Sequence, residues 1–561
     1  MASLTAPPKF PGAAAPYPPE KNFPNWPSLV AASSSYWKGA MATASGPKVL
    51  VCTNTGMHGA VSTFDTVLSV ALTLAGARAS RVFCDGVMPS CLMPTYGDAT
   101  PPDLIADRGL VTKLCKACLN RGTNASRAVD LPEHRLSHFL NPDDYKEAEA
   151  TAARIPVAEI RAWTLDGIAV GEHAYAGALR YFATGDLVGQ PRGKDVLRRY
   201  LEGAILAARA YDRLIAKERP DVAVLHHGIY SPQGVAADVC RKRGVRVVTW
   251  VVAYRQNCFI LSHDDTYHHT LMTEPVDEWE RLELSEAQES VVHSYLASRA
   301  SGGRDWIYFH KDAGQDFEAL AAAKGIDRSK PVVSAFTNVV WDAQLHYPAN
   351  VFPGMIEWLI ETIRHFAARP EIEFVVRVHP AETRGAIKSR QLATDEIAKA
   401  FPSLPPNIHI IGPEEEANSY ALAKASNAVI IYGTKMGTEL APLGIPVIVA
   451  GEAWIKNKGV TKDPSSREDY FALLNQLPIP EGAWAPDVNR AAKYAYHFFF
   501  RRMMPLPFLE PNGTGAMFDV KVGHMNELAP GRWPGLDAMV DGIITGAPFV
   551  YRAEEHGVHD A

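Results

Sequence analysis

The sequence predicts an α/β protein in which two doubly wound domains face a cleft. Two blocks of the chain carry this prediction, because in each block short apolar segments of strand length alternate with longer amphipathic segments of helix length. At 561 residues the chain is too long for a single hydrophobic core, so at least two domains are expected. The hydrophobic fraction of 47% and the charged fraction of 21% are those of an ordinary globular protein.

The first block has the pattern of a βαβ unit that is interrupted by a long helical stretch and then resumes. Its strands are expected at 48–52, 80–84, 222–225 and 245–251, and its helices at 62–74, over most of 130–217, and at 233–243. Polar turns follow the first and third of these strands. Side chains in those turns are therefore expected to lie at the edge of the sheet where α/β proteins bind ligands.

The second block is a complete doubly wound unit. Its strands are expected at 331–336, 373–378, 408–411, 428–431 and 446–449, with helices at 352–368 and 418–424. Amphipathic segments at 490–500 and 533–544 follow it. In a two-lobed protein these last helices are expected to pack back on the first lobe.

The chain is therefore divided into five parts. They are an irregular Pro-rich tail (1–45), a first domain (46–275) with a Cys-rich insertion (84–118), a helical connector (276–330), a second domain (331–489) and C-terminal helices (490–561). The tail lacks the basic start and apolar core of a signal peptide, and no apolar run approaches the roughly 20 residues of a membrane span. A cytoplasmic protein is expected. The net charge of −6 argues against nucleic acid as a partner.

The first motif of interest is Arg377-Val378-His379-Pro380, which directly follows a predicted strand of the second domain. Pro380 fixes the turn, and Arg377 and His379 lie two residues apart, on the same side of the strand. A cation and an imidazole on one face suit a phosphate or a carboxylate. The alternative is a turn that simply ends the strand and carries a buried histidine.

The second motif is the segment 432–439, which follows the strand at 428–431. Gly433 and Gly437 flank Thr434, a hydroxyl donor that can cap the next helix, and a helix N-terminus attracts anions. Glu439, in the first turns of that helix, can accept hydrogen bonds from ribose hydroxyls or can act as a capping carboxylate. Together the two motifs indicate a pocket for a nucleotide that carries an activated group.

These motifs, with Asn418-Ser419-Tyr420 and the run Gly-Ile-Pro-Val-Ile-Val-Ala-Gly at 444–451, resemble capsule polysaccharide biosynthesis proteins and related GT-B glycosyltransferases. That group includes Kdo transferases and sialyltransferases that use CMP-activated sugars. The resemblance is clear over 331–475 and weaker over 46–270. It implies two Rossmann-like domains and places donor-binding roles on His379, Pro380, Thr434 and Glu439. With their neighbours in the two motifs, the expected donor site also includes Arg377, Gly433, Lys435 and Gly437. Lys435 and Met436 stand where the family has small residues, which leaves the donor sugar open.

The resemblance also implies a reaction: transfer of a sugar from a nucleotide-sugar donor to a saccharide acceptor in surface or capsular polysaccharide biosynthesis. GT-B transfer usually needs no bound metal, because helix dipoles and basic side chains stabilise the leaving phosphate. A base from the first domain would deprotonate the acceptor if the configuration is inverted. The candidates are His58, His227 and Asp265, with Asp264 and the Glu172-His173 pair as further ones. Each of these could instead be a packing or surface residue.

Other functions on the same two-lobed fold remain open. They are a CDP-alditol phosphotransferase, a UDP-sugar 2-epimerase, and a non-catalytic scaffold that binds a polysaccharide-assembly partner. Peripheral association with assembly machinery at the inner face of the membrane is a further expectation.

Four of the seven cysteines, Cys84, Cys91, Cys115 and Cys118, have the spacing C-x6-C-x23-C-x2-C. The close pair at 115 and 118 matches the way one turn supplies two thiolates to zinc, so a structural zinc site is expected. The alternatives are four buried thiols or an iron–sulfur cluster. Four thiolate ligands would leave no open position for catalysis.

Overall fold

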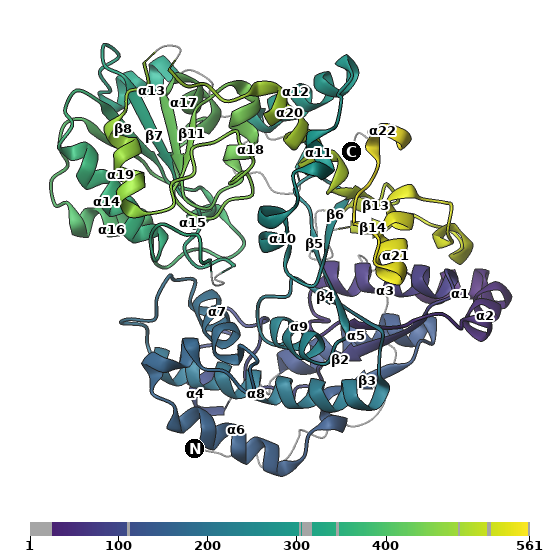
Figure 1. The fold of residues 1–561 in the computed structure, drawn as a ribbon. Helices are drawn as coiled ribbons and strands as arrows, with labels where there is room; N and C mark the ends of the chain where they lie inside the picture. Colours follow the sequence, from purple (N-terminus) through teal and green to yellow (C-terminus); the bar gives the residue numbers. More distant parts are fainter. Residues whose placement is uncertain are drawn as a thin grey trace.

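The computed structural model describes residues 25–108, 113–301, 304–305, 317–343, 347–480, 483–512 and 518–558, and it consists of two α/β lobes (Figure 1). Within these residues the first lobe contains a seven-stranded sheet in the order β12-β6-β5-β4-β1-β2-β3. The strands are β1 (Lys48–Cys52), β2 (Arg78–Phe83), β3 (Glu133–Arg135), β4 (Val222–His226), β5 (Arg246–Val252), β6 (Cys258–His263) and β12 (Met504–Pro505). The strands from β3 to β5 pair in parallel, and β6 and β12 pair antiparallel.

The first sheet is covered on both faces, as its continuous apolar strands predict. Successive residues of β1 point to opposite faces: Val49 and Val51 join the core beneath α3 (Gly59–Leu74), and Leu50 and Cys52 join the core beneath α8 (Gly193–Glu218). The strand order reverses between β1 and β4, so the turns after these two strands lie at the topological switch point, where α/β sheets bind ligands.

The second lobe repeats this architecture with a fully parallel sheet. Among the described residues its order is β11-β10-β7-β8-β9. The strands are β7 (Val332–Phe336), β8 (Glu373–Arg377), β9 (Ile408–Ile411), β10 (Ala428–Ile431) and β11 (Val447–Val449). One face packs on α14 (Met355–Ala367) and the other on α17 (Ser419–Ala425) and α18 (Met436–Leu440). The switch point of this sheet lies between β7 and β10. The expected α/β fold of two doubly wound lobes is confirmed.

The chain crosses between the lobes twice. It leaves the first lobe through α10 (Tyr267–Thr273), α11 (Asp277–Glu280), α12 (Glu286–Ser301) and α13 (Phe317–Lys324), and it returns through α20 (Val488–Tyr496) and the π-helical turn η4 (His497–Arg501). Beyond η4, β12 joins the first sheet beside β6, and α21 (Pro534–Thr545) packs on α3. The C-terminal segment, yellow in Figure 1, therefore belongs to the first lobe, as expected.

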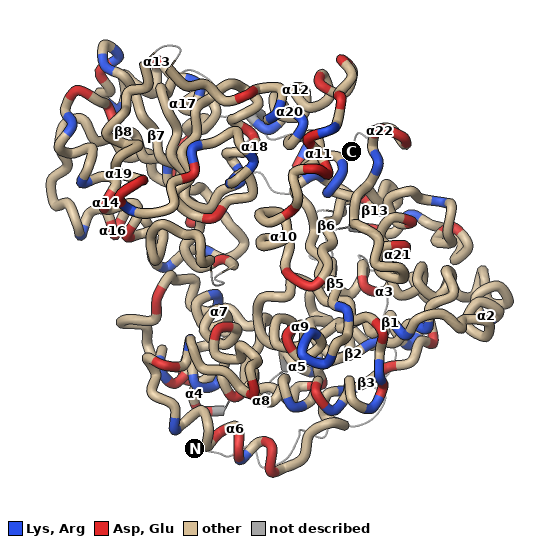
Figure 2. Tube along the Cα trace, in the orientation of Figure 1, with Lys and Arg blue, Asp and Glu red and all other residues tan. Residues whose placement is uncertain are grey.

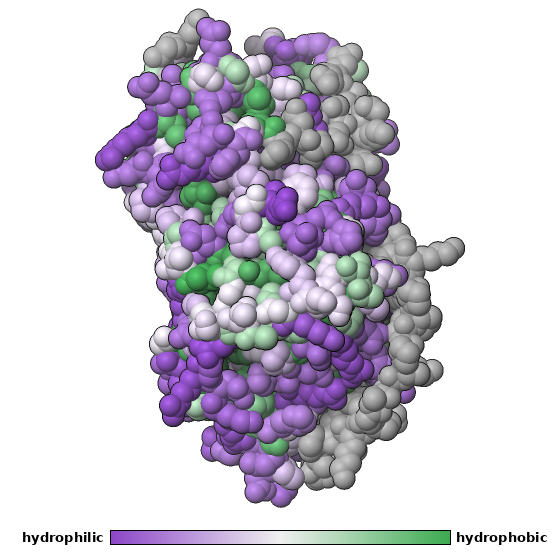
Figure 3. All heavy atoms as spheres, turned by 90° about the vertical axis from the view of Figure 1, so that its right-hand side faces the viewer, coloured by the Kyte–Doolittle hydropathy of each residue, from purple (hydrophilic) through white to green (hydrophobic). Residues whose placement is uncertain are grey.

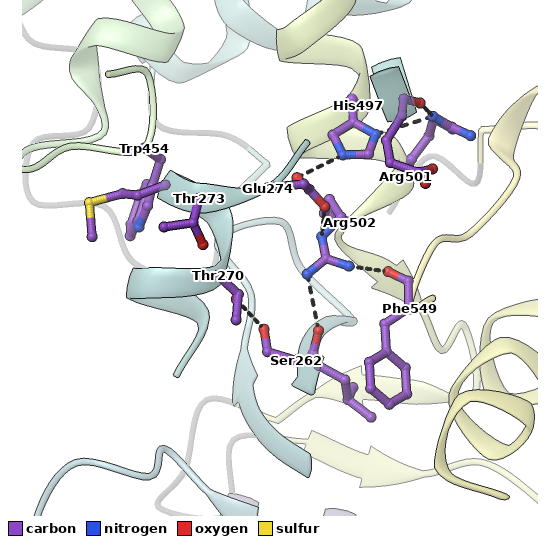
Figure 4. Close-up of polar contacts among 12 residues, drawn as sticks. Ser262, Thr270, Thr273, Glu274, Trp454, His497, Arg501, Arg502 and Phe549 are labelled. Atoms are coloured by element: carbon purple, nitrogen blue, oxygen red, sulfur yellow. Dashed lines mark hydrogen bonds and ion pairs between the residues drawn. The ribbon is translucent and has the colours of Figure 1, made fainter. Parts of the chain in front are cut away.

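A buried polar cluster ties the two crossing segments together (Figure 4). Glu274, on the outgoing segment, pairs with His497 Nε2 at 3.0 Å and with Arg502 Nε at 3.2 Å. Arg502 also donates to the carbonyls of Phe549 and Leu261. Burial alone would raise the pKa of Glu274, but Arg502 and His497 lower it to about 2, so the carboxylate stays ionised. The cluster fixes the junction from which the second lobe projects.

The expectation of an irregular tail is wrong for residues 26–43, which form α1 (Trp26–Ala32) and α2 (Ser34–Thr43). Asn25 caps the first helix by accepting the N–H of Ser28 at 3.2 Å. Trp37 is buried and its indole N–H donates to the carbonyl of Val129 at 2.8 Å. The tail prediction also covers residues 1–24, which lie outside the described residues.

Residues of both charge signs are distributed over the two lobes. Lys and Arg are interspersed with Asp and Glu along both lobes (Figure 2). The face drawn in Figure 3 is mostly hydrophilic, with small apolar patches among the polar residues. No helix within the described ranges has the length and apolar character needed to cross a membrane.

Candidate functional site

A cavity of about 1140 Å³ lies between the two lobes. On one side it is lined by the turns that follow β7 and β10, which is the switch point of the second sheet, and on the other by residues of the first lobe such as Tyr175 and Tyr254. Most of the sequence-predicted donor residues line it: Arg377, His379, Pro380, Gly433, Thr434, Lys435 and Glu439. The structure thus brings the two motifs into one cavity.

His379 sits at the end of β8 with a defined hydrogen-bonding state. Its backbone N–H donates to Thr337 Oγ1 at 2.9 Å, and the N–H of Ala381 donates to His379 Nδ1 at 3.1 Å. Because Nδ1 accepts this bond, the ring proton is on Nε2. Burial, with the charges of Lys435 and Arg377, lowers the pKa of His379 to about 4. The ring is therefore a neutral N–H donor at pH 7.

Arg377, two residues earlier, holds the loop that follows β9. Its guanidinium donates to the carbonyls of Gly412 at 2.6 Å, Glu415 at 3.1 Å and Ala417 at 3.3 Å. The side chain is 2% exposed. These bonds give Arg377 a positioning role: it shapes the loop that leads to Asn418, part of the cavity wall.

The turn after β10 presents small groups to the cavity. Thr434 Oγ1 accepts the N–H of Met436 at 3.4 Å at the start of α18, and Gly433 is exposed to the cavity. Gly437 has a different role, because a Cβ there would lie 2.6 Å from Ile455 Cγ2 and 3.0 Å from Ile431 Cδ1. Gly437 is required for packing of the short helix against its neighbours, and it does not line the cavity.

Glu439 is the centre of a buried ionic cluster. One carboxylate oxygen accepts Arg299 Nε at 3.0 Å and Lys435 Nζ at 2.9 Å, and the other accepts the Tyr420 hydroxyl at 2.5 Å. Arg299 also pairs with Asp305. Burial alone would raise the pKa of Glu439, but Arg299 and Lys435 hold it below its ordinary value. Both oxygens have partners within the protein, so Glu439 orients two cations at the cavity wall.

Arg299 was not predicted from the sequence. It lies on α12 in the connector, far from the motifs along the chain, and it reaches the site only through the folding of the connector against the second lobe. Its spacing from Glu439 has no pattern that a sequence could display. The predicted Lys435, in contrast, lies four residues before Glu439, which is ordinary helical ion-pair spacing.

Aromatic rings from both lobes form a further part of the cavity wall. Trp454 of the second lobe has its ring centroid 5.6 Å from that of Tyr254, 5.7 Å from Tyr267 and 5.9 Å from His268, all of the first lobe. Lys435 Nζ lies 4.9 Å from the centre of the Tyr254 ring. All five residues line the cavity. The wall offers flat apolar surface next to a cation.

Of the sequence-predicted bases, Glu172 lines this cavity, whereas His58, His227 and Asp265 do not. His58 and His227 belong to a histidine cluster behind the cavity wall, where the ring of His58 lies 5.5 Å from His226 and that of His227 lies 6.1 Å from His268. Burial is the main reason that the pKa of each of His58 and His227 is lowered to about 4. His227 has a φ of 66°, a left-handed conformation that is unusual for a non-glycine residue.

Asp265 is also outside the cavity lining. Its carboxylate pairs with His269 Nδ1 at 3.1 Å and accepts the N–H of Thr266 at 2.6 Å. Burial raises its pKa, but the bonds to His269 and Thr266 lower it below the ordinary value. Glu172 and Asp186 are first-lobe carboxylates that do line the cavity. Position at a strand end does not reveal which side chains reach the cavity, and of the expected bases only Glu172 is among its lining residues.

The four clustered cysteines lie away from the cavity. Cys84, Cys91, Cys115 and Cys118 are free thiols, and none of them lines it. In the part of the chain that the structure describes, no group of three or more His, Cys, Asp or Glu side chains stands arranged around a metal position.

No family model matches the chain, and no curated protein matches it. Among solved structures, the chain is similar to the β-Kdo 2,4-transferase KpsC of Thermosulfurimonas dismutans, with 13% identity over 55% of this chain and 88% of that one and a TM-score of 0.34. It is similar to the UDP-GlcNAc 2-epimerase of Neisseria meningitidis bound to UDP-GlcNAc (10% identity, 80% and 95% covered, TM-score 0.24). It is also similar to SsfS6, a glycosyltransferase of Streptomyces sp. SF2575 (11% identity, 80% and 94% covered, TM-score 0.22). The two-lobed α/β fold follows from the strand order of the two sheets themselves.

Proposed function

We propose that this protein is a GT-B glycosyltransferase that moves a sugar from a nucleotide-sugar donor to a saccharide acceptor. One observation carries the proposal: the interlobe cavity places a neutral imidazole N–H donor, a buried pair of cations and an aromatic wall around one space at the switch point of the second sheet. A cavity of about 1140 Å³ is large enough for a nucleotide sugar and part of an acceptor.

The donor phosphate is assigned to the region between His379, Lys435 and Arg299. The Nε2–H of His379 donates without carrying a charge, and the two cations supply positive potential. Glu439 and Asp305 hold these cations in fixed positions, so little reorganisation is needed when negative charge develops on the leaving phosphate. The turn at Gly433 and Thr434 allows a close approach of the backbone to the same phosphate.

The nucleoside is assigned to the neighbouring part of the cavity, where the loop after β9 leads into α17. Asn418, Ser419 and Tyr420 line the cavity there, and Asn418 caps α17 by accepting the N–H groups of Tyr420 and Ala421. Arg377 fixes the preceding carbonyls. A loop fixed in this way can present backbone groups to the edge of a base. The proposal of a CMP-activated donor and of a capsular polysaccharide pathway comes from the resemblance of the motifs.

The acceptor is assigned to the first-lobe side, where Tyr175, Tyr254 and Tyr267 line the cavity. Aromatic rings with polar tips suit sugars, which have apolar faces and polar edges. Glu172 is the proposed base, because it is a first-lobe carboxylate at the cavity, whereas His58, His227 and Asp265 are not at the cavity. It would accept the proton of the attacking acceptor hydroxyl while the bond between the sugar and the phosphate breaks.

The test is a nucleotide-release assay with CMP-, UDP- and GDP-sugars, with and without oligosaccharide acceptors, on the wild type and on Glu172→Gln. The proposal expects acceptor-dependent release of one nucleotide by the wild type and loss of that release in the variant. Interconversion of a UDP-sugar without any acceptor would instead indicate an epimerase. Binding of no nucleotide at all would indicate a scaffold.

A further inference from the structure

Asn338 carries an amide oxygen in the cavity wall that the protein itself does not use. The residue follows β7, at the switch point of the second sheet, and it lines the interlobe cavity. Its backbone N–H donates to Met355 Sδ at 3.2 Å, and its side-chain nitrogen donates to the carbonyl of Val339 at 3.3 Å. Among the described residues, no donor reaches the side-chain oxygen Oδ1, which is shielded from solvent. A shielded acceptor without a partner costs free energy, which a donor group on a ligand can recover.

This oxygen lies beside the turn that is assigned to the donor phosphate. A Cβ built on Gly433 would lie 3.8 Å from Asn338 Oδ1. The bond to Met355, the first residue of α14, puts Asn338 on the α14 side of the second sheet. Helix α17, where the nucleoside is assigned, covers the opposite face. In a nucleotide sugar the phosphate stands between the nucleoside and the sugar, so the part of the donor on the α14 side is the sugar.

The wall around Asn338 offers acceptors and no cation. We call the cavity-lining residues within 336–343 and 350–357 the α14 wall, and these two segments contain no Lys, Arg or His. Their carboxylates, Asp342 and Glu357, line the cavity. Asp342 Oδ1 accepts the Tyr230 hydroxyl at 3.1 Å, and Glu357 pairs with Arg467, which is not among the lining residues. A ligand group at this wall must therefore bring hydrogen-bond donors, as sugar hydroxyl and amino groups do.

We propose that Asn338 is a specificity-determining residue for the donor sugar, and that its Oδ1 accepts a hydrogen bond from a hydroxyl or amino group of the transferred sugar. The inference rests on the proposed function, because it needs a nucleotide sugar in the cavity. The terminal torsion of an asparagine side chain is soft, so rotation about it turns the oxygen from the Gly433 turn toward the sugar. The substrate class is a sugar that presents a free hydroxyl or amino group to the α14 wall.

The test compares nucleotide sugars with their bare nucleotides by calorimetry, using CMP, UDP and GDP and the sugars linked to each. The quantity of interest is the affinity that the sugar adds, the ratio of the two Kd values. Asn338→Ala should reduce this ratio about 3- to 10-fold and leave the affinity for the bare nucleotide unchanged, because one hydrogen bond to the sugar is lost. Asn338→Asp keeps an acceptor and should keep the ratio. The control is Asn475→Ala, at an exposed position that ends α19 (Arg467–Asn475), and it should change neither affinity.

Deoxy analogues of the sugar provide a second measurement, which uses the wild type and so decides the matter even if a variant folds poorly. Among analogues that each lack one hydroxyl or amino group, one should bind the wild type about 3- to 10-fold more weakly than the parent sugar. That analogue and its parent should bind Asn338→Ala equally well, because both changes remove the same contact.

Three results would overturn the proposal. They are an unchanged ratio in Asn338→Ala, an equal loss of affinity for the bare nucleotide and the nucleotide sugar, which would place Asn338 at the phosphate, and a deoxy series that the wild type binds as tightly as the parent. A wild type that binds none of the nucleotides would instead refute the donor site itself, and this inference with it. The first three results leave the donor site standing, so the two failures are distinguishable.

Discussion

Replacement of Glu439 by Gln tests the ionic cluster at the cavity wall most sharply. The substitution keeps the shape of the side chain but removes the charge that Arg299 and Lys435 share at 3.0 and 2.9 Å. The side chains of Glu439 and Arg299 are only 1% and 6% exposed, so solvent screens little of the change. Removing one partner of a buried pair typically costs 3–5 kcal/mol, and because Asp305 still neutralises Arg299 we expect about 3 kcal/mol.

The assay is thermal unfolding of the second lobe followed by tryptophan fluorescence. At about 2–4 °C per kcal/mol for a domain of this size, Glu439→Gln should lower the midpoint by about 6–12 °C. Glu416→Gln is the matched control, because the same substitution is made there at an exposed position of the same lobe. A midpoint equal to that of the control would refute the view that this carboxylate organises the two cations.

The pH dependence of the same variant provides a second check. The folded-state pKa of Glu439 is depressed below the ordinary 4.5, so its ion pairs stabilise the protein above that value. This stabilisation is lost as the pH falls through the depressed folded-state pKa. The difference in stability between wild type and Glu439→Gln should therefore be full at pH 7 and shrink below about pH 4.5. A difference that is constant down to pH 3 would contradict the assignment.

Three further predictions concern the cavity. His379→Ala should weaken nucleotide binding about 10- to 100-fold in calorimetry, because a hydrogen bond to a charged group is lost. Since burial lowers the pKa of His379 to about 4, this loss of affinity should be equal at pH 6 and pH 8. A loss of affinity seen only at pH 6 would mean that the ring binds as a cation. Arg377→Lys should speed hydrogen exchange in 412–418, because an ammonium cannot serve three carbonyls at once, and unchanged exchange would argue against its positioning role. Glu172→Gln should lower kcat by about 10²- to 10⁴-fold and leave the nucleotide affinity unchanged. An equal loss of kcat and of nucleotide affinity would assign Glu172 to binding.

Much of the architecture was predictable from the sequence because strand and helix lengths differ and the strands are almost wholly apolar. The β7–β11 strands lie within a residue or two of their expected positions, and His379 and Thr434 follow β8 and β10 as expected. The sequence does not predict the two early helices, because the Pro-rich composition of the N-terminal segment outweighs the local signals for a helix. One signal is the cap at Asn25. The other is Trp37, which is buried and donates to the carbonyl of Val129 far along the chain.

The parts of the site that the sequence did not reveal depend on tertiary contacts. Arg299 meets Glu439 only because the connector folds against the second lobe. Likewise the sequence predicts that Glu439 and Gly437 bind the donor, but the structure pairs Glu439 with Arg299 and Lys435. It packs Gly437 against Ile455. Local spacing identifies which residue types stand at a strand end. The side chains that contact those residues come from distant segments of the chain, which local spacing does not show.

Hydrogen exchange with mass spectrometry, in the presence and absence of CMP, CDP, UDP and GDP, tests whether a nucleotide-sugar donor site lies between the lobes. One of these nucleotides should slow exchange in the segments 377–381 and 432–439 together, and His379→Ala should abolish this protection. Protection of neither segment by any of the four nucleotides, at concentrations that saturate ordinary nucleotide sites, would contradict a donor site there.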